Sequence, residues 1–296
     1  MKNGLLLFLY FLMGFIKVNS QNIEMSFPKF AGKSYDFVIF QGSEQKTINQ
    51  GVIPEDGKFM LSLPKEYEPY KGMSRWLITG TREGGGLDMY IPGQDFSISC
   101  AEAMPDEKNI IYTNNTGNNE LNKLDKYQEE IVSRYEAMLM ATRSYNVSSP
   151  HYPLFKSELE QQKKNYARFQ NELRQKTDYI SHFLLIVNIT RTMGSTLTDS
   201  EVEKAKDIAG YISKDLDWGT LYTSGHWTSV IGFWVNIHSN VLKDSPEFVK
   251  EFKMISAKIP AGTRYMDFCE KVAYYLKEFK KEDYLGLIYA VKDTVN

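Results

Sequence analysis

The sequence predicts an α+β protein, with an N-terminal antiparallel β-sandwich-like domain over residues 22–115 and an all-α helical domain over residues 118–296. Residues 22–113 consist of short runs of β-branched and aromatic residues separated by turn-forming residues, which is typical of strands. From Asn118 onward, apolar residues recur every three or four positions, which is typical of amphipathic helices. Because the strand-like runs follow one another without helices between them, they favour antiparallel pairing over a doubly wound sheet.

The composition is that of a folded protein without a strong charge. The 296 residues are 42% hydrophobic and 14% aromatic, and their net charge is −2. This apolar content is enough to build a core, which argues against global disorder. A charge so close to zero gives no reason to expect nucleic acid or an anionic membrane surface as a partner.

The first twenty residues, Met1–Ser20, have the layout of a secretory signal peptide. Lys2 supplies a basic start, an apolar run covers Leu5–Ile16, and small residues precede the expected cleavage point. The run is shorter than the roughly 20 residues that span a bilayer. We therefore expect cleavage after Ser20, a mature chain that starts at Gln21 without a membrane span, and a periplasmic or cell-envelope location. An uncleaved membrane anchor is the alternative.

Turn residues divide the strand-rich part into six predicted strands. The dipeptide Asp56-Gly57 separates the second strand from the third, and Asp-Gly between two strand-like runs is a strong hairpin signal. We therefore expect these two strands to pair with each other. The glycines Gly84–Gly86 precede the fifth strand and are expected at a hairpin tip, since a phosphate-binding loop requires a helix to follow. The predicted strands are Tyr35–Gln41, Thr47–Ile53, Lys58–Leu63, Arg75–Thr79, Leu87–Ile91 and Asp95–Cys100.

Two apolar stripes on either side of Asn146–Pro153 predict a pair of antiparallel helices of about 20 residues each. One stripe includes Gln128, and the other includes Gln162. The polar stretch Asn114–Asn119 precedes them, and we expect it to be an exposed junction that proteases cut first. Further helices are predicted at Tyr179–Arg191, Asp199–Ser213, His226–Ser239, Pro246–Lys258, Arg264–Lys280 and Tyr284–Asp293.

The two cysteines give no sign of redox chemistry. Cys100 shares one face of a predicted strand with Phe96 and Ile98, and Cys269 falls on the apolar stripe of a predicted helix. Both are expected to be buried thiols that behave as small apolar side chains. The sequence contains no Cys-x-x-Cys motif. A disulfide between Cys100 and Cys269 is the alternative in an oxidising compartment.

No other motif predicts a reaction. Ser62–Lys65 has the Ser-x-x-Lys spacing of penicillin-recognising enzymes, but it ends a predicted strand, contains a proline and lacks the companion motifs. No two histidines have the spacing of metal ligands on one helix face. His226 begins an aromatic helix and is expected to be structural, with pocket lining as the alternative. Hence we predict no catalytic, cofactor-binding or metal-binding residue, and no cofactor. The histidines are His151, His182, His226 and His238, and Asn114, Asn146 and Asn188 match the glycosylation pattern used in eukaryotic secretion.

Three segments resemble a known family. Phe30–Phe37, together with Gly51–Phe59, resembles the N-terminal region of thioredoxin-like envelope proteins of Bacteroides-type bacteria, often described as alkyl hydroperoxide reductases or TlpA-like thiol:disulfide oxidoreductases. Leu221–Trp227 and the helices after it resemble the helical segment that precedes the thioredoxin domain in those proteins.

The resemblance implies an accessory role. The family's chemistry resides in a C-terminal thioredoxin fold with a Cys-x-x-Cys motif, whose first thiol has a lowered pKa. No segment of residues 1–296 matches that fold. We therefore expect an exported, non-catalytic binding or interaction module, either a stand-alone accessory part or a truncated form of a longer protein. The alternative is a component of a periplasmic oxidoreductase or peroxidase system. The expected partner is a thioredoxin-domain protein or another envelope protein.

Overall fold

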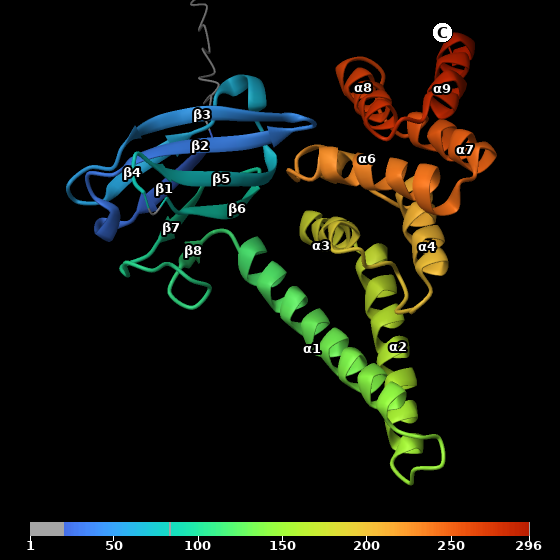
Figure 1. Cartoon of the computed structure of the whole chain (residues 1–296). Helices are drawn as coiled ribbons and strands as arrows, with labels where there is room; N and C mark the ends of the chain where they lie inside the picture. The colour runs from blue at the N-terminus through green and yellow to red at the C-terminus, as the bar shows by residue number, and fades with distance from the viewer. Residues whose placement is uncertain (1–20, 83, 296) are drawn as a thin grey trace, which may run out of the picture.

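Two four-stranded sheets form the N-terminal part of the chain and helices form the rest, which confirms the predicted α+β class (Figure 1). The structure is a computed structural model and describes residues 21–82 and 84–295. The predicted signal peptide, Met1–Ser20, lies outside the described residues and stays a prediction.

The first sheet has the strand order β4-β1-β7-β8. Its central strand β1 pairs antiparallel with β4 and parallel with β7, so Ile23 lies opposite both Leu61 and Phe96. The sheet is therefore mixed rather than purely antiparallel. Neither β1 nor β8 was predicted. The strands are β1 (Asn22–Ser26), β4 (Lys58–Ser62), β7 (Phe96–Ser99) and β8 (Ile111–Thr113).

The second sheet is antiparallel throughout and has the order β3-β2-β5-β6. Its first hairpin turns at Gly42 and Ser43, and Gly42 has a φ of 61°, a conformation that glycine adopts easily. The second hairpin turns through the predicted glycine tip, where Gly84 and Gly85 also have positive φ. The strands are β2 (Ser34–Gln41), β3 (Glu44–Val52), β5 (Lys71–Thr79) and β6 (Gly86–Pro92).

The hairpin predicted at Asp56-Gly57 is wrong. The strands on its two sides belong to different sheets, since β3 pairs with β2 and β4 pairs with β1. Gly57 has a φ of 72°, its carbonyl accepts a hydrogen bond from the Phe27 N–H, and a Cβ at this position would overlap the backbone of Pro28. The dipeptide therefore marks a tight turn against a neighbouring segment, and such a turn can carry the chain from one sheet to the other.

The core of the strand region lies between the two sheets and is aromatic. Trp76 of β5 is almost fully buried there, and its ring centroid lies 4.7 Å from that of Phe27 and 5.9 Å from that of Phe59. Burying rings of this size supplies most of the hydrophobic stabilisation available to such a region. Short 3-10 turns, η1 (Pro28–Phe30) and η2 (Lys65–Tyr67), connect the strands at its rim.

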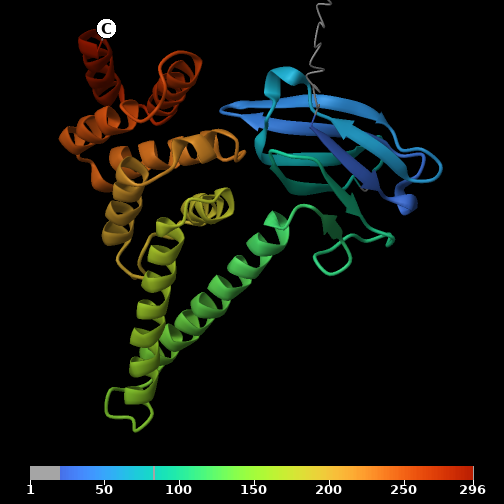
Figure 2. The ribbon, with the colours of Figure 1, turned by 180° about the vertical axis from the view of Figure 1, so that it is seen from behind.

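Helices α1 (Gly117–Ser144) and α2 (Tyr152–Gln175) form the predicted antiparallel pair. Their joined outer ends project as an arm away from the sheets and the later helices, as the opposite views of Figure 1 and Figure 2 show, whereas their inner parts pack against the next helix, α3. Apolar side chains are exposed at the outer end of the arm, among them Met140, Val147 and Leu154.

The remaining helices pack around one large apolar core. Asp178, Ser200, Asp217 and Asp244 each cap a helix by accepting a backbone N–H, which satisfies donors that the helix itself leaves unpaired. Two elements were not predicted, the short α5 and a π-helical segment, η3, that continues α6. The elements are α3 (Tyr179–Thr190), α4 (Glu201–Lys214), α5 (Trp218–Tyr222), α6 (Trp227–Asn236), η3 (Ile237–Leu242), α7 (Ser245–Ser256), α8 (Thr263–Glu278) and α9 (Glu282–Val295).

The second sheet is covered on both faces. Phe37 and Ile39 of β2 point into the sandwich, whereas Val38 and Phe40 belong to a separate apolar cluster with Phe183 and its neighbours on α3. A strand buried on both faces reads as a continuous apolar run instead of an alternating one. The helices therefore pack on the sheet itself and do not simply follow it in sequence.

The junction Asn114–Asn119 is built into this contact and is not open. The side chain of Asn115 donates to the Tyr90 carbonyl at 2.7 Å, and that of Asn118 accepts the Tyr90 N–H at 3.0 Å. Both asparagines are buried. The expectation that proteases cut here first is therefore corrected, because these asparagines hold the junction against β6.

Within residues 21–82 and 84–295, no helix combines the length and the apolar character that a membrane crossing requires.

Candidate functional site

A cleft of about 400 Å³ lies where the second sheet meets the helices. Residues between Gln41 and Lys71 line it on the sheet side, and residues of α3, α5, the turn after α5 and α8 line it on the other. Ligand sites occur preferentially at such junctions, because two packed units leave a concavity whose walls are already ordered. This cleft is therefore the first place to look for a binding function.

Two buried tyrosines form the floor of the cleft. The Tyr70 hydroxyl lies 2.8 Å from the Met73 carbonyl oxygen and accepts the Phe40 N–H at 3.1 Å. The Tyr179 hydroxyl donates to the Thr223 carbonyl at 3.0 Å and accepts the Met73 N–H at 3.2 Å. Burial raises the pKa of both phenols far above physiological pH. Both groups are thus neutral hydrogen-bonding groups that join the sheet to the helices, and neither can serve as a base.

The turn after α5 is bound to the sheet through its backbone. The Tyr222 carbonyl accepts the Gly42 N–H at 2.7 Å, and the Thr223 carbonyl accepts the Met73 N–H at 2.9 Å. The hairpin tip is held from a second side, since Asp267 of α8 accepts the Ser43 hydroxyl at 2.6 Å. This turn belongs to the segment Leu221–Trp227 that carries part of the family resemblance, and here it fixes the wall of the cleft.

The open side of the cleft presents cations and an aromatic face. The Arg264 guanidinium lies 4.1 Å from the centroid of the Tyr222 ring, a cation–π arrangement that keeps the charge at the cleft. Lys71 is exposed and lines the same cleft. Among the described residues, neither cation has a carboxylate within ion-pair distance. The carboxylate of Asp217 also lines the cleft, but it accepts two N–H groups at the start of α5.

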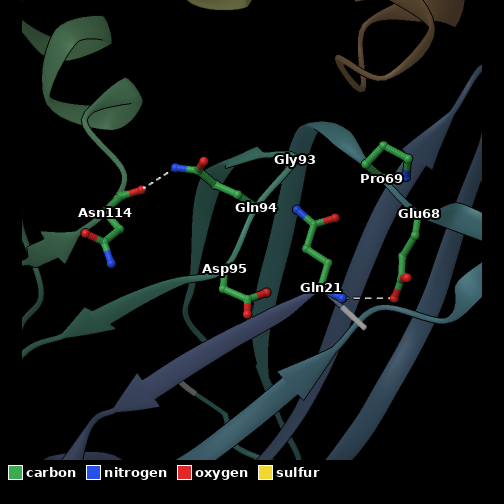
Figure 3. Close-up of a pocket in the computed structure, with 7 residues that line it drawn as sticks. All are labelled: Gln21, Glu68, Pro69, Gly93, Gln94, Asp95 and Asn114. Atoms are coloured by element: carbon green, nitrogen blue, oxygen red, sulfur yellow. Dashed lines mark hydrogen bonds between the residues drawn. The ribbon is translucent and has the colours of Figure 1, made fainter. Parts of the chain in front are cut away.

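A second depression, of about 800 Å³, surrounds the start of β1 (Figure 3). Its lining is polar, and two carboxylates face the first backbone nitrogens of the described chain. The Gln21 N–H donates to Glu68 at 2.9 Å, and the Asn22 N–H donates to Asp95 at 2.8 Å. Pro69 lines both this depression and the cleft, so the two are neighbours.

The two cysteines lie in different cores and are not joined to each other. Cys100 is 1% exposed, and its sulfur lies 3.2 Å from the side-chain oxygen of Asn109. Cys269 is fully buried among the helices. Both positions agree with the prediction of buried thiols, and neither thiol lines the cleft.

The four histidines do not gather at one place. His226 lies half-buried near the sheet, 5.7 Å from the Phe183 ring, and burial is the largest cause of the lowering of its pKa. His238 is fully buried in η3. His182 contacts the Lys176 carbonyl, and His151 lies near the outer end of the arm. His226 does not line either depression.

The remaining motifs have structural positions. The Ser62 hydroxyl donates to the Asn22 side chain at the end of β4, far from helical geometry. Asn188, one of the three glycosylation-pattern asparagines, is 2% exposed and fully engaged inside the helical region. In the part of the chain that the structure describes, no group of three or more His, Cys, Asp or Glu side chains is placed to hold a metal ion.

Sequence reasoning missed two buried polar clusters. In the first, Gln128, Gln170 and Asn188 of α1, α2 and α3 exchange amide hydrogen bonds of 2.8–3.2 Å. In the second, Glu251 of α7 accepts the Trp234 indole N–H at 2.9 Å and contacts His238 at 2.9 Å. A signal for the first cluster was present in the sequence, since Gln128 falls in an apolar stripe.

Comparison with family models, with curated proteins and with solved structures gives no match for this chain. The resemblance to thioredoxin-like envelope proteins therefore stays a prediction.

Proposed function

We propose that this chain is an exported, non-catalytic binding module, and that the cleft between the second sheet and the helices is its ligand site. The observation that carries the proposal is the pairing of Arg264 with the Tyr222 ring at the open side of a preformed cleft that the exposed Lys71 also lines. A cation that lies on a ring, in a cleft that a second cation also lines, suits a small anionic ligand that also has a flat or apolar face.

The lining supports binding rather than catalysis. The hydroxyls of Tyr70 and Tyr179 are committed to backbone groups, and the Thr223 hydroxyl donates to the Lys71 carbonyl at 2.9 Å. No residue of the lining pairs a nucleophile with a general base, which acyl- or group-transfer chemistry requires. Burial of Cys100 and Cys269 also supports a module without thiol chemistry, since exchange needs an accessible thiolate.

The proposal is tested with a panel of small carboxylated and sulfated sugars and aromatic carboxylates, using calorimetry on the chain that begins at Gln21. We expect at least one member to bind. The substitution Arg264→Gln removes a charge-assisted contact of about 1.5–3 kcal/mol, so the affinity should fall about tenfold or more. The matched control is Arg134→Gln on the exposed face of α1, which should leave the affinity unchanged.

Two outcomes would contradict the proposal. One is the absence of binding by every compound of the panel, and the other is equal affinity in wild type and Arg264→Gln. The alternative of a redox component is tested with an insulin-reduction assay. We expect no reduction by the wild-type chain, and reduction that disappears in the variant Cys100→Ser, Cys269→Ser would favour that alternative.

A further inference from the structure

Gln21, the residue that follows the predicted cleavage point, is held more tightly than a chain end requires. It is 5% exposed. Its side-chain oxygen accepts the Tyr70 N–H at 3.0 Å, its side-chain N–H donates to the Tyr70 carbonyl at 3.2 Å, and its own carbonyl accepts the Leu63 N–H at 2.9 Å. The side chain therefore pairs with Tyr70 as a neighbouring strand would. This fixes where the backbone nitrogen of Gln21 points.

That nitrogen points at a carboxylate. Figure 3 shows the Gln21 N–H donating to Glu68 in a depression whose other acidic residue is Asp95, and the distance from the nitrogen to the carboxylate oxygen is 2.9 Å. The lining contains no lysine or arginine. A peptide N–H offers this carboxylate a single hydrogen. After hydrolysis of the preceding peptide bond, the same nitrogen would carry a positive charge and three hydrogens, which suits an acidic, open and polar depression better.

We propose that the depression around Glu68 is a binding site for the α-ammonium group of the processed chain itself, and that it also protects Gln21 from cyclisation. The proposal rests on export with cleavage after Ser20. Cyclisation requires the unprotonated α-nitrogen to attack the side-chain amide carbon. A ring C–N bond forms, the bond to the side-chain nitrogen breaks, and ammonia leaves with a proton from the attacking nitrogen. The Tyr70 contacts hold the amide away from that geometry, and Glu68 favours the protonated nitrogen.

The first test compares two full mature chains made by release from a fusion partner without added residues, one that begins at Gln21 and one that begins at Ser20. At neutral pH we expect the Gln21 chain to melt about 2–4 °C higher, which is the shift that a modest single interaction causes in a chain of this size. The difference should vanish when both chains carry Glu68→Gln. It should persist with Glu66→Gln, because Glu66 is exposed on the neighbouring turn η2. Equal melting temperatures of the two chains, or an unchanged difference in Glu68→Gln, would overturn the proposal.

The second test follows cyclisation by mass spectrometry after addition of a glutaminyl cyclase. We expect the folded Gln21 chain to keep its side-chain amide, whereas the same chain in urea should cyclise and lose the mass of ammonia. Conversion of the folded chain at the rate of the unfolded chain would overturn the protective role. Both tests use protein made outside the export pathway. N-terminal sequencing of exported protein tests cleavage separately, so a start other than Gln21 would overturn the export proposal without changing either measurement.

Discussion

The two cores of this protein are built differently. The core between the sheets is a cluster of apolar and aromatic side chains around Trp76. The core of the helical region is also largely apolar, but the chain buries two polar clusters inside that region, centred on Asn188 and on Glu251. In a sheet, backbone hydrogen bonds already join neighbouring strands. Helices have no such bonds between them, so we infer that the buried polar side chains select which helices pack together.

The strongest test of this contrast is the removal of Glu251. In Glu251→Leu the Trp234 indole N–H and the facing nitrogen of His238 lose their buried partner, so we expect a loss of about 3–5 kcal/mol in the free energy of unfolding. Urea titration measures this loss. The matched control is Glu247→Leu, one turn earlier on α7, where the exposed ion pair with Lys250 should contribute less than about 1 kcal/mol. Similar losses in the two variants would show that the buried carboxylate does not hold the helices.

Substitutions in the cluster of Gln128, Gln170 and Asn188 should lower the free energy of unfolding less than Glu251→Leu, but they give a sharper test. Asn188→Leu leaves the amides of Gln128 and Gln170 partly unpaired, and we expect a loss of about 1–3 kcal/mol. Replacing all three residues together with Leu or Met removes donors and acceptors alike and should cost much less than the sum of the single substitutions. Urea titration of the four variants gives the comparison. Additive losses would mean that the three amides act separately and do not select the packing of α1, α2 and α3.

The contact between the two regions should couple their unfolding. Tyr179→Phe removes the hydroxyl that bonds Thr223 and Met73, and we expect a loss of about 1 kcal/mol. We follow urea unfolding of the helices by circular dichroism and of the sheets by the indole NMR signal of Trp76. The unfolding midpoints that the two probes report should fall by the same amount. Tyr274→Phe, at an exposed tyrosine of α8, is the control. If the helical signal shifted and the Trp76 signal did not, the two cores would be independent.

The smallest effect concerns pH at the same contact. Burial lowers the pKa of His226 below its ordinary value of 6.5, with Arg75 adding to the shift and Asp88 opposing it. The unfolded chain therefore binds a proton that the folded chain does not, and stability falls as the pH drops below about 6.5. We expect a smaller loss between about pH 7.5 and about pH 5 in His226→Gln. Urea midpoints measure it, with the exposed His151→Gln as control. An equal loss in His226→Gln and wild type would contradict this assignment.

Local sequence patterns were sufficient for some features and insufficient for others. Apolar residues that recur every three or four positions predicted α1 and α2, because an amphipathic helix repeats this spacing over many residues. The run Phe37–Phe40 also held an unused signal, since four consecutive apolar residues in a strand indicate burial on both faces. Gly57 shows the limit, because positive φ specifies a turn but not the sheet that the next strand joins.

The candidate site was beyond the reach of local patterns. Lys71 and Arg264 both line the cleft, although they lie far apart in the sequence and no motif relates them. The cleft forms where the helices, α3 among them, pack on the second sheet. The Gln21 site likewise combines the start of β1 with Glu68 on the segment after η2. The predicted absence of catalytic residues arose from motifs alone, and it neither located the cleft nor identified the charges that line it.

The arm formed by α1 and α2 has a consequence for how the molecule behaves in solution. At 1.5 Å per residue, the 24 residues of α2 alone extend about 36 Å. The outer ends of α1 and α2 project beyond the sheets and the later helices (Figure 1), so the molecule is less compact than a globule of the same length, whose radius of gyration would be about 19 Å. The molecule should therefore tumble anisotropically and elute from a sizing column ahead of a compact protein of equal mass. The arm also holds the exposed apolar side chains of its outer end away from the rest of the molecule.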